Sequence, residues 1–277
     1  GSMTADFPGA ADRWRGLRNS LMDETGLVRE LEDTVRFGLA LYSARSSEPR
    51  GPAMGMCPLV TLVDPALSNF DAIDAVYSDE DPIDETPTGD SVDFILDWIG
   101  SIPDPSEDPT IFILATDGEP DTCEQANPQE GQEEAIAAVG RAYLAGIRTF
   151  IISVGEGVVS SEHLQDVANA GLGRRGGDPD AEFWVAGDDD GLRSALGDII
   201  GGELSCVIEL MGRVNPDEAC EGEVRLNGDE VPPCDEENGW VPVDESHIEL
   251  RGESCERLQN TPGVTLEAEF PCNVILI

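Results

Sequence analysis

The apolar run TIFILAT at residues 110–116, which ends directly in Asp117–Gly118, constrains the fold of this chain more than any other feature. A continuous apolar segment of this length is typical of a strand that is buried on both faces of a parallel sheet. A second such run covers residues 148–154, and apolar residues at helical spacing, positions 136, 139 and 143, lie between the two. Because parallel strands need a crossover of this kind, the sequence predicts a β-α-β unit.

The same alternation extends from residue 14 to residue 200. Helical spacing of apolar residues recurs in five further segments, at residues 14–21, 70–77, 92–99, 164–168 and 192–199. Strand-like segments cover residues 35–42, 58–63 and 182–185. We therefore predict an α/β fold, a doubly wound and mostly parallel sheet with helices on both faces. Ligands of such sheets bind at the carboxyl ends of the strands, and Asp117 lies at one of these ends.

The pattern changes after Gly201–Gly202, where helical periodicity stops. Short strand candidates separated by Pro, Gly, Asn and Asp follow, at residues 205–210, 223–226, 241–243, 247–250 and 265–270. We predict two domains, a first over residues 1–202 and a small, disulfide-containing, all-β domain over residues 203–277. Within the second, Asn227–Gly228 predicts a hairpin turn, and Trp240 is interpreted as a core residue.

Charge and cysteines restrict the classes of function. The chain has 16 Lys and Arg against 57 Asp and Glu, a net charge of −41, which opposes binding to nucleic acids and to anionic membranes. No apolar run reaches transmembrane length. Seven cysteines without CxxC spacing, and only two histidines, argue against a zinc site and favour disulfides. We therefore expect an oxidising, extracytoplasmic location.

Three segments are expected to meet at one edge of the predicted sheet. They carry Ser2 in the N-terminal GSM, Thr86 in ETPTG and Asp117 in FILATDGEPD. Two hydroxyls and a carboxylate are ligands that a hard divalent cation prefers. Each residue has a simpler interpretation, because Asp117–Gly118 also suits a turn and Thr86 also suits the start of a helix.

These motifs resemble those of the von Willebrand factor A domain family, in its bacterial secreted or surface form, over residues 1–200. The family's metal site combines a DxSxS motif after the first strand, a threonine from a later loop and an aspartate after the fourth strand. Thr86 and Asp117 match the threonine and the aspartate. Ser2 would be the last serine of a D-x-S-G-S-M motif. The segment AGIRTFIISVG is similar to the family's fifth strand.

By this resemblance the first motif is incomplete. Its aspartate, its first serine and the strand before them would lie upstream of residue 1, and the alternative is that GSM is the remnant of an expression tag. The family places that first strand in the middle of the sheet. The resemblance therefore predicts weak or absent metal affinity and reduced stability for the chain as it stands.

The resemblance implies cation-mediated recognition. The site would hold Mg²⁺, or Mn²⁺ or Ca²⁺, and leave one coordination position open for a Glu or Asp carboxylate of a protein partner. Such a protein is not an enzyme, and its role is adhesion or surface assembly. One alternative is a structural surface module with a vestigial metal site. Another is a subunit of a chelatase-like ATPase complex, against which the cysteines and acidity argue.

The cysteine and acidic residues give further expectations. Cys57 and Cys123 are the only cysteines of the first domain, and we expect a disulfide between them that fastens the Asp117 loop to the edge of the sheet. Cys220 and Cys234 flank the predicted hairpin and are candidates to pair, whereas the connectivity of the other three cysteines stays open. The acidic run at residues 78–85 is interpreted as a solvated loop. Glu119 and Asp121 lie near Asp117 and could tune the site, but a solvated loop is the preferred interpretation for them as well. The run lacks the glycine and terminal glutamate of an EF-hand.

Overall fold

The structure is a computed structural model that describes residues 2–45, 51–103, 109–126, 129–155, 160–203, 205–235, 237–260 and 264–276. The chain forms two compact units, Gly1–Ala195 and Leu196–Ile277, and each is described by itself. The boundary falls within α7 (Asp189–Glu203), a little before the predicted boundary after residue 202. Among the described residues, no helix combines the length and the apolar character needed to cross a membrane.

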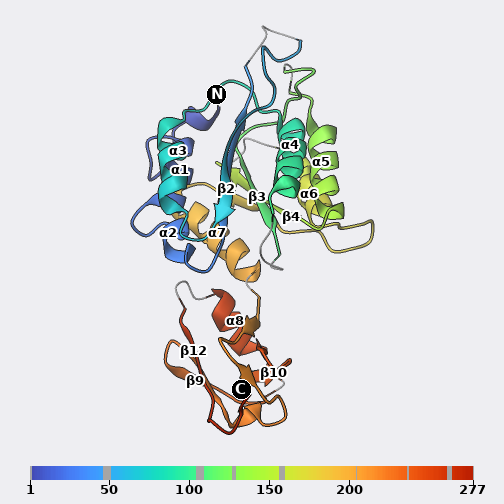
Figure 1. Cartoon of the computed structure of the whole chain (residues 1–277). Coiled ribbons are helices and arrows are strands. Elements are labelled where there is room, and N and C mark those ends of the chain that lie inside the picture. Colours follow the sequence, from blue (N-terminus) through green and yellow to red (C-terminus); the bar gives the residue numbers. More distant parts are fainter. Residues whose placement is uncertain are drawn as a thin grey trace. The chain divides into compact units, whose positions relative to one another are not determined.

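The first unit contains two small sheets (Figure 1). One is parallel and has the order β3 (Ile111–Thr116), β4 (Arg148–Val154), β5 (Trp184–Ala186). The other is an antiparallel pair of β1 (Phe37–Ser43) and β2 (Leu59–Ala66). The predicted mixture of helices and parallel strands is thus present, but the described strands form separate sheets rather than one.

Helices flank the strands of this unit on two sides (Figure 1). One group consists of α1 (Arg13–Met22), α2 (Leu27–Leu31) and α3 (Phe70–Asp79), and the other of α4 (Thr88–Ser101), α5 (Gln132–Leu144) and α6 (Ser161–Gly171). The first group packs against apolar residues of β1 and β2. The second packs against β3 and β4 around Leu114 and Ile151, and Tyr42 of β1 joins this second cluster. A short 3-10 helix, η1 (Ser2–Thr4), precedes α1.

Strands β3 and β4 differ in burial although both are apolar. All residues of β4 after Arg148 are buried, whereas Leu114 is the only buried residue of β3. β4 is paired on both sides, and β3 only on the side of β4. The expectation that β3 is fully buried on both faces is therefore wrong for the described residues, and one edge of β3 also lacks a neighbouring strand among them.

After the end of α7, the described residues of the second unit form short antiparallel strands, a 3-10 helix and one α-helix. The strands are β6 (Val207–Glu209), β7 (Arg213–Val214), β8 (Glu223–Leu226), β9 (Asp229–Val231), β10 (Trp240–Pro242), β11 (His247–Leu250), β12 (Leu266–Glu269) and β13 (Ile275–Leu276). They form sheets in the orders β10-β11-β6, β12-β8-β9 and β13-β7. The helices are η2 (Ala219–Glu221) and α8 (Glu253–Asn260), so the expectation of an all-β domain is wrong. The α8 sequence is almost entirely polar. Its buried residues, Ser254 and Leu258, lie about one helical turn apart, so the sequence contains almost no helical spacing of apolar residues.

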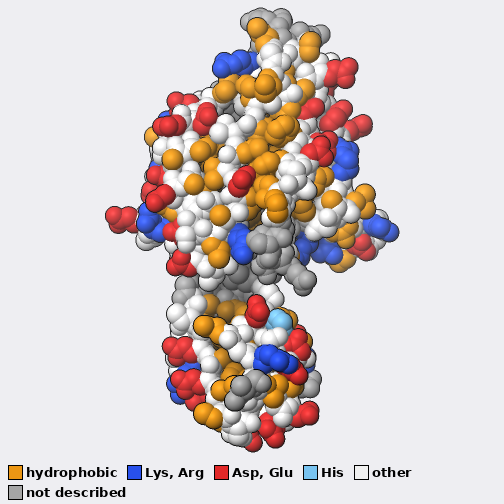
Figure 2. Space-filling view, viewed as in Figure 1, with side chains coloured by type: hydrophobic (Ala, Val, Ile, Leu, Met, Phe, Trp, Pro, Cys, Tyr) orange, Lys and Arg blue, Asp and Glu red, His pale blue; other side chains and the backbone are white. Residues whose placement is uncertain are grey.

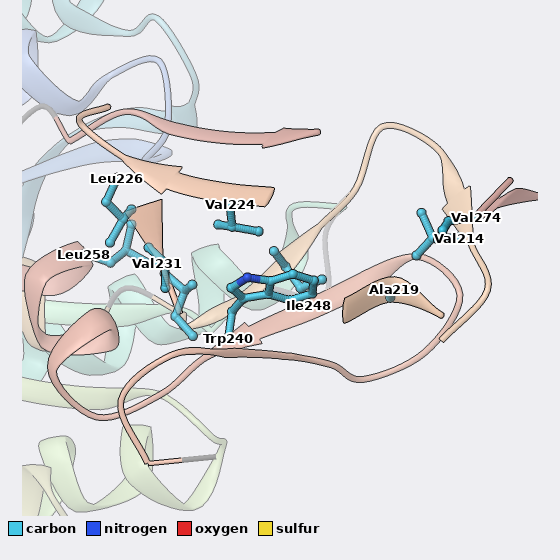
Figure 3. Close-up of a cluster of buried hydrophobic side chains, with 10 residues drawn as sticks. Val214, Ala219, Val224, Leu226, Val231, Trp240, Ile248, Leu258 and Val274 are labelled. Carbon is cyan, nitrogen blue, oxygen red and sulfur yellow. The ribbon is translucent and has the colours of Figure 1, made fainter. Parts of the chain in front are cut away.

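Trp240 is the largest fully buried side chain of the second unit (Figure 3). Val224, Leu226 and Ile248 belong to the same buried cluster, and the Phe270 ring meets Trp240 edge-on with centroids 6.0 Å apart. The predicted hairpin is confirmed: Leu226 pairs with Asp229 across the two-residue turn. Both turn residues have positive φ, which asparagine and glycine tolerate best.

Disulfides fasten this small unit. The predicted Cys220–Cys234 pair is confirmed, and Cys206 pairs with Cys255. Cys272 is the exposed free thiol that the odd count of cysteines required. Two covalent links and one buried tryptophan suit a unit too small to depend on an apolar core alone.

Candidate functional site

The candidate site lies at the carboxyl end of β3. Asp117 follows the strand directly and is buried, with 3% of the residue exposed. The Ser2 hydroxyl donates a hydrogen bond to Asp117 Oδ1 at 2.8 Å, across 115 residues of sequence. The structure therefore brings together two of the three residues proposed as metal ligands.

Arg13, at the start of α1, is a third member of this site that the sequence analysis missed. Its Nη1 lies 3.3 Å from Asp117 Oδ2 and 3.4 Å from the Ser2 carbonyl oxygen. The side chain is only 13% exposed. Gly155, directly after β4, makes room for it, since a Cβ there would come within 2.6 Å of Arg13 Nε. The guanidinium thus supplies the positive charge next to the Asp117 carboxylate.

The environment of Asp117 sets its protonation. Burial raises the pKa of this carboxyl above its usual value, while the Ser2 hydroxyl and the Arg13 guanidinium oppose the rise. A buried carboxylate of this kind gains from a nearby cation, because a positive charge offsets the desolvation of the ionised form.

Thr86 is placed near the site by its backbone. Its N–H donates to Asp121 Oδ2 at 2.9 Å, and its carbonyl oxygen accepts from the Asp121 N–H at 2.9 Å. Within the described part of the chain, no hydrogen bond joins the Thr86 side chain to Ser2 or Asp117. The predicted set of three ligands is therefore not assembled as a bonded group.

The donor chemistry fits a hard divalent cation in part. Ser2 and Asp117 offer a hydroxyl and a carboxylate side by side, which suits Mg²⁺. However, Arg13 already lies against one carboxylate oxygen. Among the described residues, no three His, Cys, Asp or Glu side chains are grouped as metal ligands.

Asp121 departs from the expected solvated loop. It is 1% exposed, and its Oδ1 atom has no hydrogen-bond partner among the described residues. Burial and the neighbouring Glu85 carboxyl raise the Asp121 pKa to about 6, against the opposing hydrogen bond from Thr86 N–H. The sequence carried no signal for this burial, because DGEPD reads as a polar turn.

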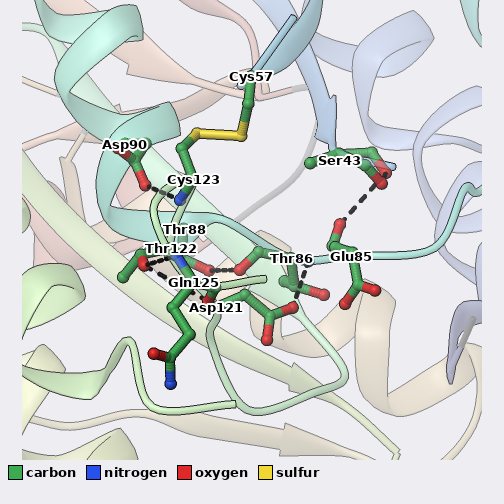
Figure 4. Close-up of a disulfide and its surroundings, with 11 residues drawn as sticks. Ser43, Cys57, Glu85, Thr86, Thr88, Asp90, Asp121, Thr122, Cys123 and Gln125 are labelled. Atoms are coloured by element: carbon green, nitrogen blue, oxygen red, sulfur yellow. Dashed lines mark hydrogen bonds between the residues drawn. A yellow bond between two sulfur atoms is a disulfide. The ribbon is translucent and has the colours of Figure 1, made fainter. Parts of the chain in front are cut away.

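The predicted disulfide between Cys57 and Cys123 is confirmed (Figure 4). The Cys123 N–H donates to Asp90 Oδ2 of α4 at 2.8 Å, and its carbonyl oxygen accepts from Ala53 N–H at 3.0 Å. The segment that follows Asp117 is thus fixed to the residues before β2 and to α4 at once.

Comparison with known proteins shows that the fold of this chain is similar to that of solved structures. No known protein family matches the chain, and no curated protein matches its sequence. Two solved structures of the pilus adhesin SpaC from Lactobacillus rhamnosus GG are similar. One crystal form has 13% identity and a TM-score of 0.54 over 92% of this chain and 36% of that chain. The open conformation has 12% identity and a TM-score of 0.52 over 87% and 35%.

A third structure, proximal thread matrix protein 1 from the mussel byssus, has 17% identity and a TM-score of 0.44 over 73% of this chain and 44% of that chain, too low to carry an argument. The chain spans about a third of the SpaC chain. Because the first unit ends at Ala195 of 277 residues, a likeness over 92% of the chain extends into the second unit. The fold of the described chain is therefore similar to that of part of a pilus adhesin.

Proposed function

We propose that this chain is part of an extracytoplasmic adhesion or surface-assembly protein, and that it binds a protein partner through a divalent cation at Asp117. The observation that carries the proposal is the contact between the Ser2 hydroxyl and the buried Asp117 carboxylate at the carboxyl end of β3. Three disulfides and the likeness to a pilus adhesin support the location and the role. In this proposal the chain binds and does not catalyse.

The proposal includes a doubly wound sheet of the von Willebrand factor A type. Tyr42 near the end of β1 packs in the same cluster as Leu114 of β3, and its hydroxyl is within hydrogen-bonding reach of Thr116. The carboxyl ends of β1 and β3 therefore lie on the same side. Each strand has one edge without a partner among the described residues.

A strand preceding residue 1 would run between β1 and β3, parallel to both, and end at Ser2. Figure 2, viewed as Figure 1, supports this with apolar side chains gathered across the face where β2 and β3 lie. Such a strand would pair both free edges and cover these side chains. In this proposal the strand would also bring an aspartate and a serine of the metal motif to Asp117.

The roles of the chain's own residues follow from their positions. Asp117 and Ser2 would hold the cation, and Thr86 would contribute its hydroxyl from the segment just before α4. The bound cation supplies an open coordination position for a carboxylate of the partner. Arg13 would have to give up its contact with Asp117 Oδ2 when the cation binds, since two positive charges next to one carboxylate repel.

Calorimetric titration with Mg²⁺ and Mn²⁺ tests the proposal on two proteins, this chain and the chain extended upstream with its natural sequence. We expect the extended protein to bind and Asp117→Ala to abolish binding. Asp84→Ala removes one exposed charge and serves as the matched control. Binding by neither protein, or binding that survives Asp117→Ala, would overturn the metal site.

A second candidate function is a structural surface module with a vestigial metal site. The observation that favours it is Arg13, whose guanidinium neutralises Asp117 without any metal. Partner binding that is unchanged by a chelator, in a protein with the upstream segment present, would select this alternative.

A further inference from the structure

Asp121 is a buried residue whose carboxylate is satisfied at only one of its two oxygens among the described residues. The residue is 1% exposed. One carboxylate oxygen, Oδ2, accepts a hydrogen bond from Thr86 N–H at 2.9 Å. Oδ1 is buried and has no hydrogen-bond partner among the described residues. Leaving a charged acceptor unsatisfied inside a protein costs more than leaving a neutral one, so this oxygen calls for a ligand.

A second carboxyl, that of Glu85, lies beside Asp121. The two side chains are within hydrogen-bonding reach of each other, and Figure 4 shows both next to Thr86. The backbone of Glu85 is fixed by two hydrogen bonds with Ala44, the N–H donating at 3.1 Å and the carbonyl accepting at 3.2 Å. The backbone that carries the Glu85 carboxyl is therefore fixed in position.

The loops that carry this pair are held by further links. Cys123, two residues after Asp121, is bonded to Cys57 and donates its N–H to Asp90. The two backbone hydrogen bonds between Thr86 and Asp121 fix their segments to one another. A site of this kind is pre-organised, so a ligand does not have to order the loops when it binds.

Two neighbouring carboxyls, one buried and one partly exposed, have two ways to avoid repulsion. They can share a proton, or they can share a cation. The surroundings favour a cation at neutral pH, because the net charge of the chain is −41 and Asp81 and Asp84 lie in the same acidic segment as Glu85. A strongly negative surface raises the local concentration of cations.

We propose that Asp121 and Glu85 form a calcium site that is separate from the Asp117 site. Ca²⁺ accepts irregular shells of about six to eight oxygens, including waters, whereas Mg²⁺ demands a near-ideal octahedron. Two carboxyls from different loops, one buried and one partly exposed, suit the irregular shell. The site would tie the segment before α4 to the segment after β3, and it stands whether or not Asp117 binds metal.

Calorimetric titration of the whole chain with Ca²⁺ at neutral pH, after removal of metals with a chelator, tests this site. We expect one saturable site in the unmodified protein, and a loss of affinity on the order of tenfold or more in Asp121→Asn. Glu85→Gln is the second variant, in case Asp121→Asn fails to fold, and should show a similar loss. Thermal melting with and without Ca²⁺ gives an independent readout, with an increase in Tm only where the site is intact.

Two controls separate this site from its surroundings. Asp84→Asn removes one exposed charge beside Glu85, and Glu124→Gln removes one exposed charge three residues after Asp121. Both should leave the Ca²⁺ affinity within about threefold of the unmodified protein. The proposal is overturned if the unmodified protein shows no saturable Ca²⁺ binding, or if either control weakens binding as much as Asp121→Asn. Failure of the Asp117 site would instead appear in the Mg²⁺ titration, so the two failures are distinguishable.

Discussion

The two units of this chain reach stability by different means. The first surrounds its strands with helices, and it carries one disulfide, which lies at the candidate site. The second has strands of two to four residues, two disulfides and one fully buried tryptophan. The larger unit can therefore tolerate the buried carboxylates of its candidate site, because many other contacts stabilise the unit. The smaller unit depends on a few contacts that it cannot lose.

Trp240→Ala should have the largest effect and should act on the second unit alone. Removing a fully buried indole costs about 4 kcal/mol of unfolding free energy, through lost burial and the cavity left behind. Differential scanning calorimetry should show the transition of the second unit lost or strongly lowered, with that of the first unit unchanged. Trp240→Phe keeps most of the packing and should be milder. An equal loss in both transitions would contradict the separation of the two units.

Loss of the Cys220–Cys234 disulfide should come next. The double variant Cys220→Ser, Cys234→Ser releases a short loop and should cost about 3 kcal/mol in the second unit, measured by denaturant unfolding. Cys272→Ser changes an exposed free thiol and should have no measurable effect. If the double variant were as stable as Cys272→Ser, the dependence of this unit on its disulfides would be refuted.

Asp121 should make the stability of the first unit depend on pH. Its pKa of about 6 in the folded state lies above the ordinary 3.8, so the folded protein holds this proton more tightly than the unfolded chain. The stabilisation is present below about pH 4 and is lost as the pH rises through 6, up to about 3 kcal/mol in the absence of calcium.

Asp121→Asn removes this titration and offers Glu85 an amide donor. In chelator-treated protein, the variant should be more stable than the unmodified protein at pH 7 and lose this advantage at pH 4, as measured by urea unfolding at both values. A difference between the two proteins that does not change with pH would show that Asp121 does not titrate as its burial implies.

Arg13→Gln should cost about 2 kcal/mol in the first unit, because it leaves the Asp117 carboxylate buried without its positive partner. Arg15 forms exposed ion pairs with Asp12 and Asp81, so Arg15→Gln should cost less than about 1 kcal/mol. Equal effects in thermal melts of the two variants would mean that the Arg13 pair is no better protected from solvent than a surface pair.

Tyr77→Phe should have the smallest effect. The Tyr77 hydroxyl is buried without a partner among the described residues, and the ring packs edge-on against Trp14 at 4.7 Å. Phenylalanine keeps the ring and removes the unsatisfied hydroxyl, so stability should rise by up to about 1 kcal/mol in denaturant unfolding. A clear loss of stability would show that the hydroxyl has a partner, such as a bound water.

Much of the secondary structure could be predicted because it depends on local patterns. The predicted strands at residues 223–226 and 247–250 coincide with β8 and β11, and the helical stripe at residues 92–99 lies within α4. The antiparallel direction of β1 and β2 could not be predicted, since an apolar strand has the same alternation whichever way it runs. The α8 helix was missed because its sequence is nearly all polar.

The site was harder to predict because its contacts are long-range. The residue types at Ser2 and Asp117 pointed to a common site, but their hydrogen bond spans 115 residues and depends on the whole first unit. Arg13 was missed, and the burial of Asp121 was not predicted, because charged residues are exposed in most proteins and only tertiary packing buries these two. The Cys57–Cys123 bond was predictable because no other cysteine lies in that part of the chain.

That disulfide also determines how the chain responds to mechanical tension. A force applied to the two ends travels along the backbone to Cys57, crosses the sulfur atoms to Cys123 and continues from there. The residues between them, which include β2, α3, α4 and β3, carry no load and cannot be pulled straight. Since 66 positions separate the cysteines, the disulfide shortens the fully stretched length of the chain by roughly 220 Å. Single-molecule stretching before and after reduction would show this length released.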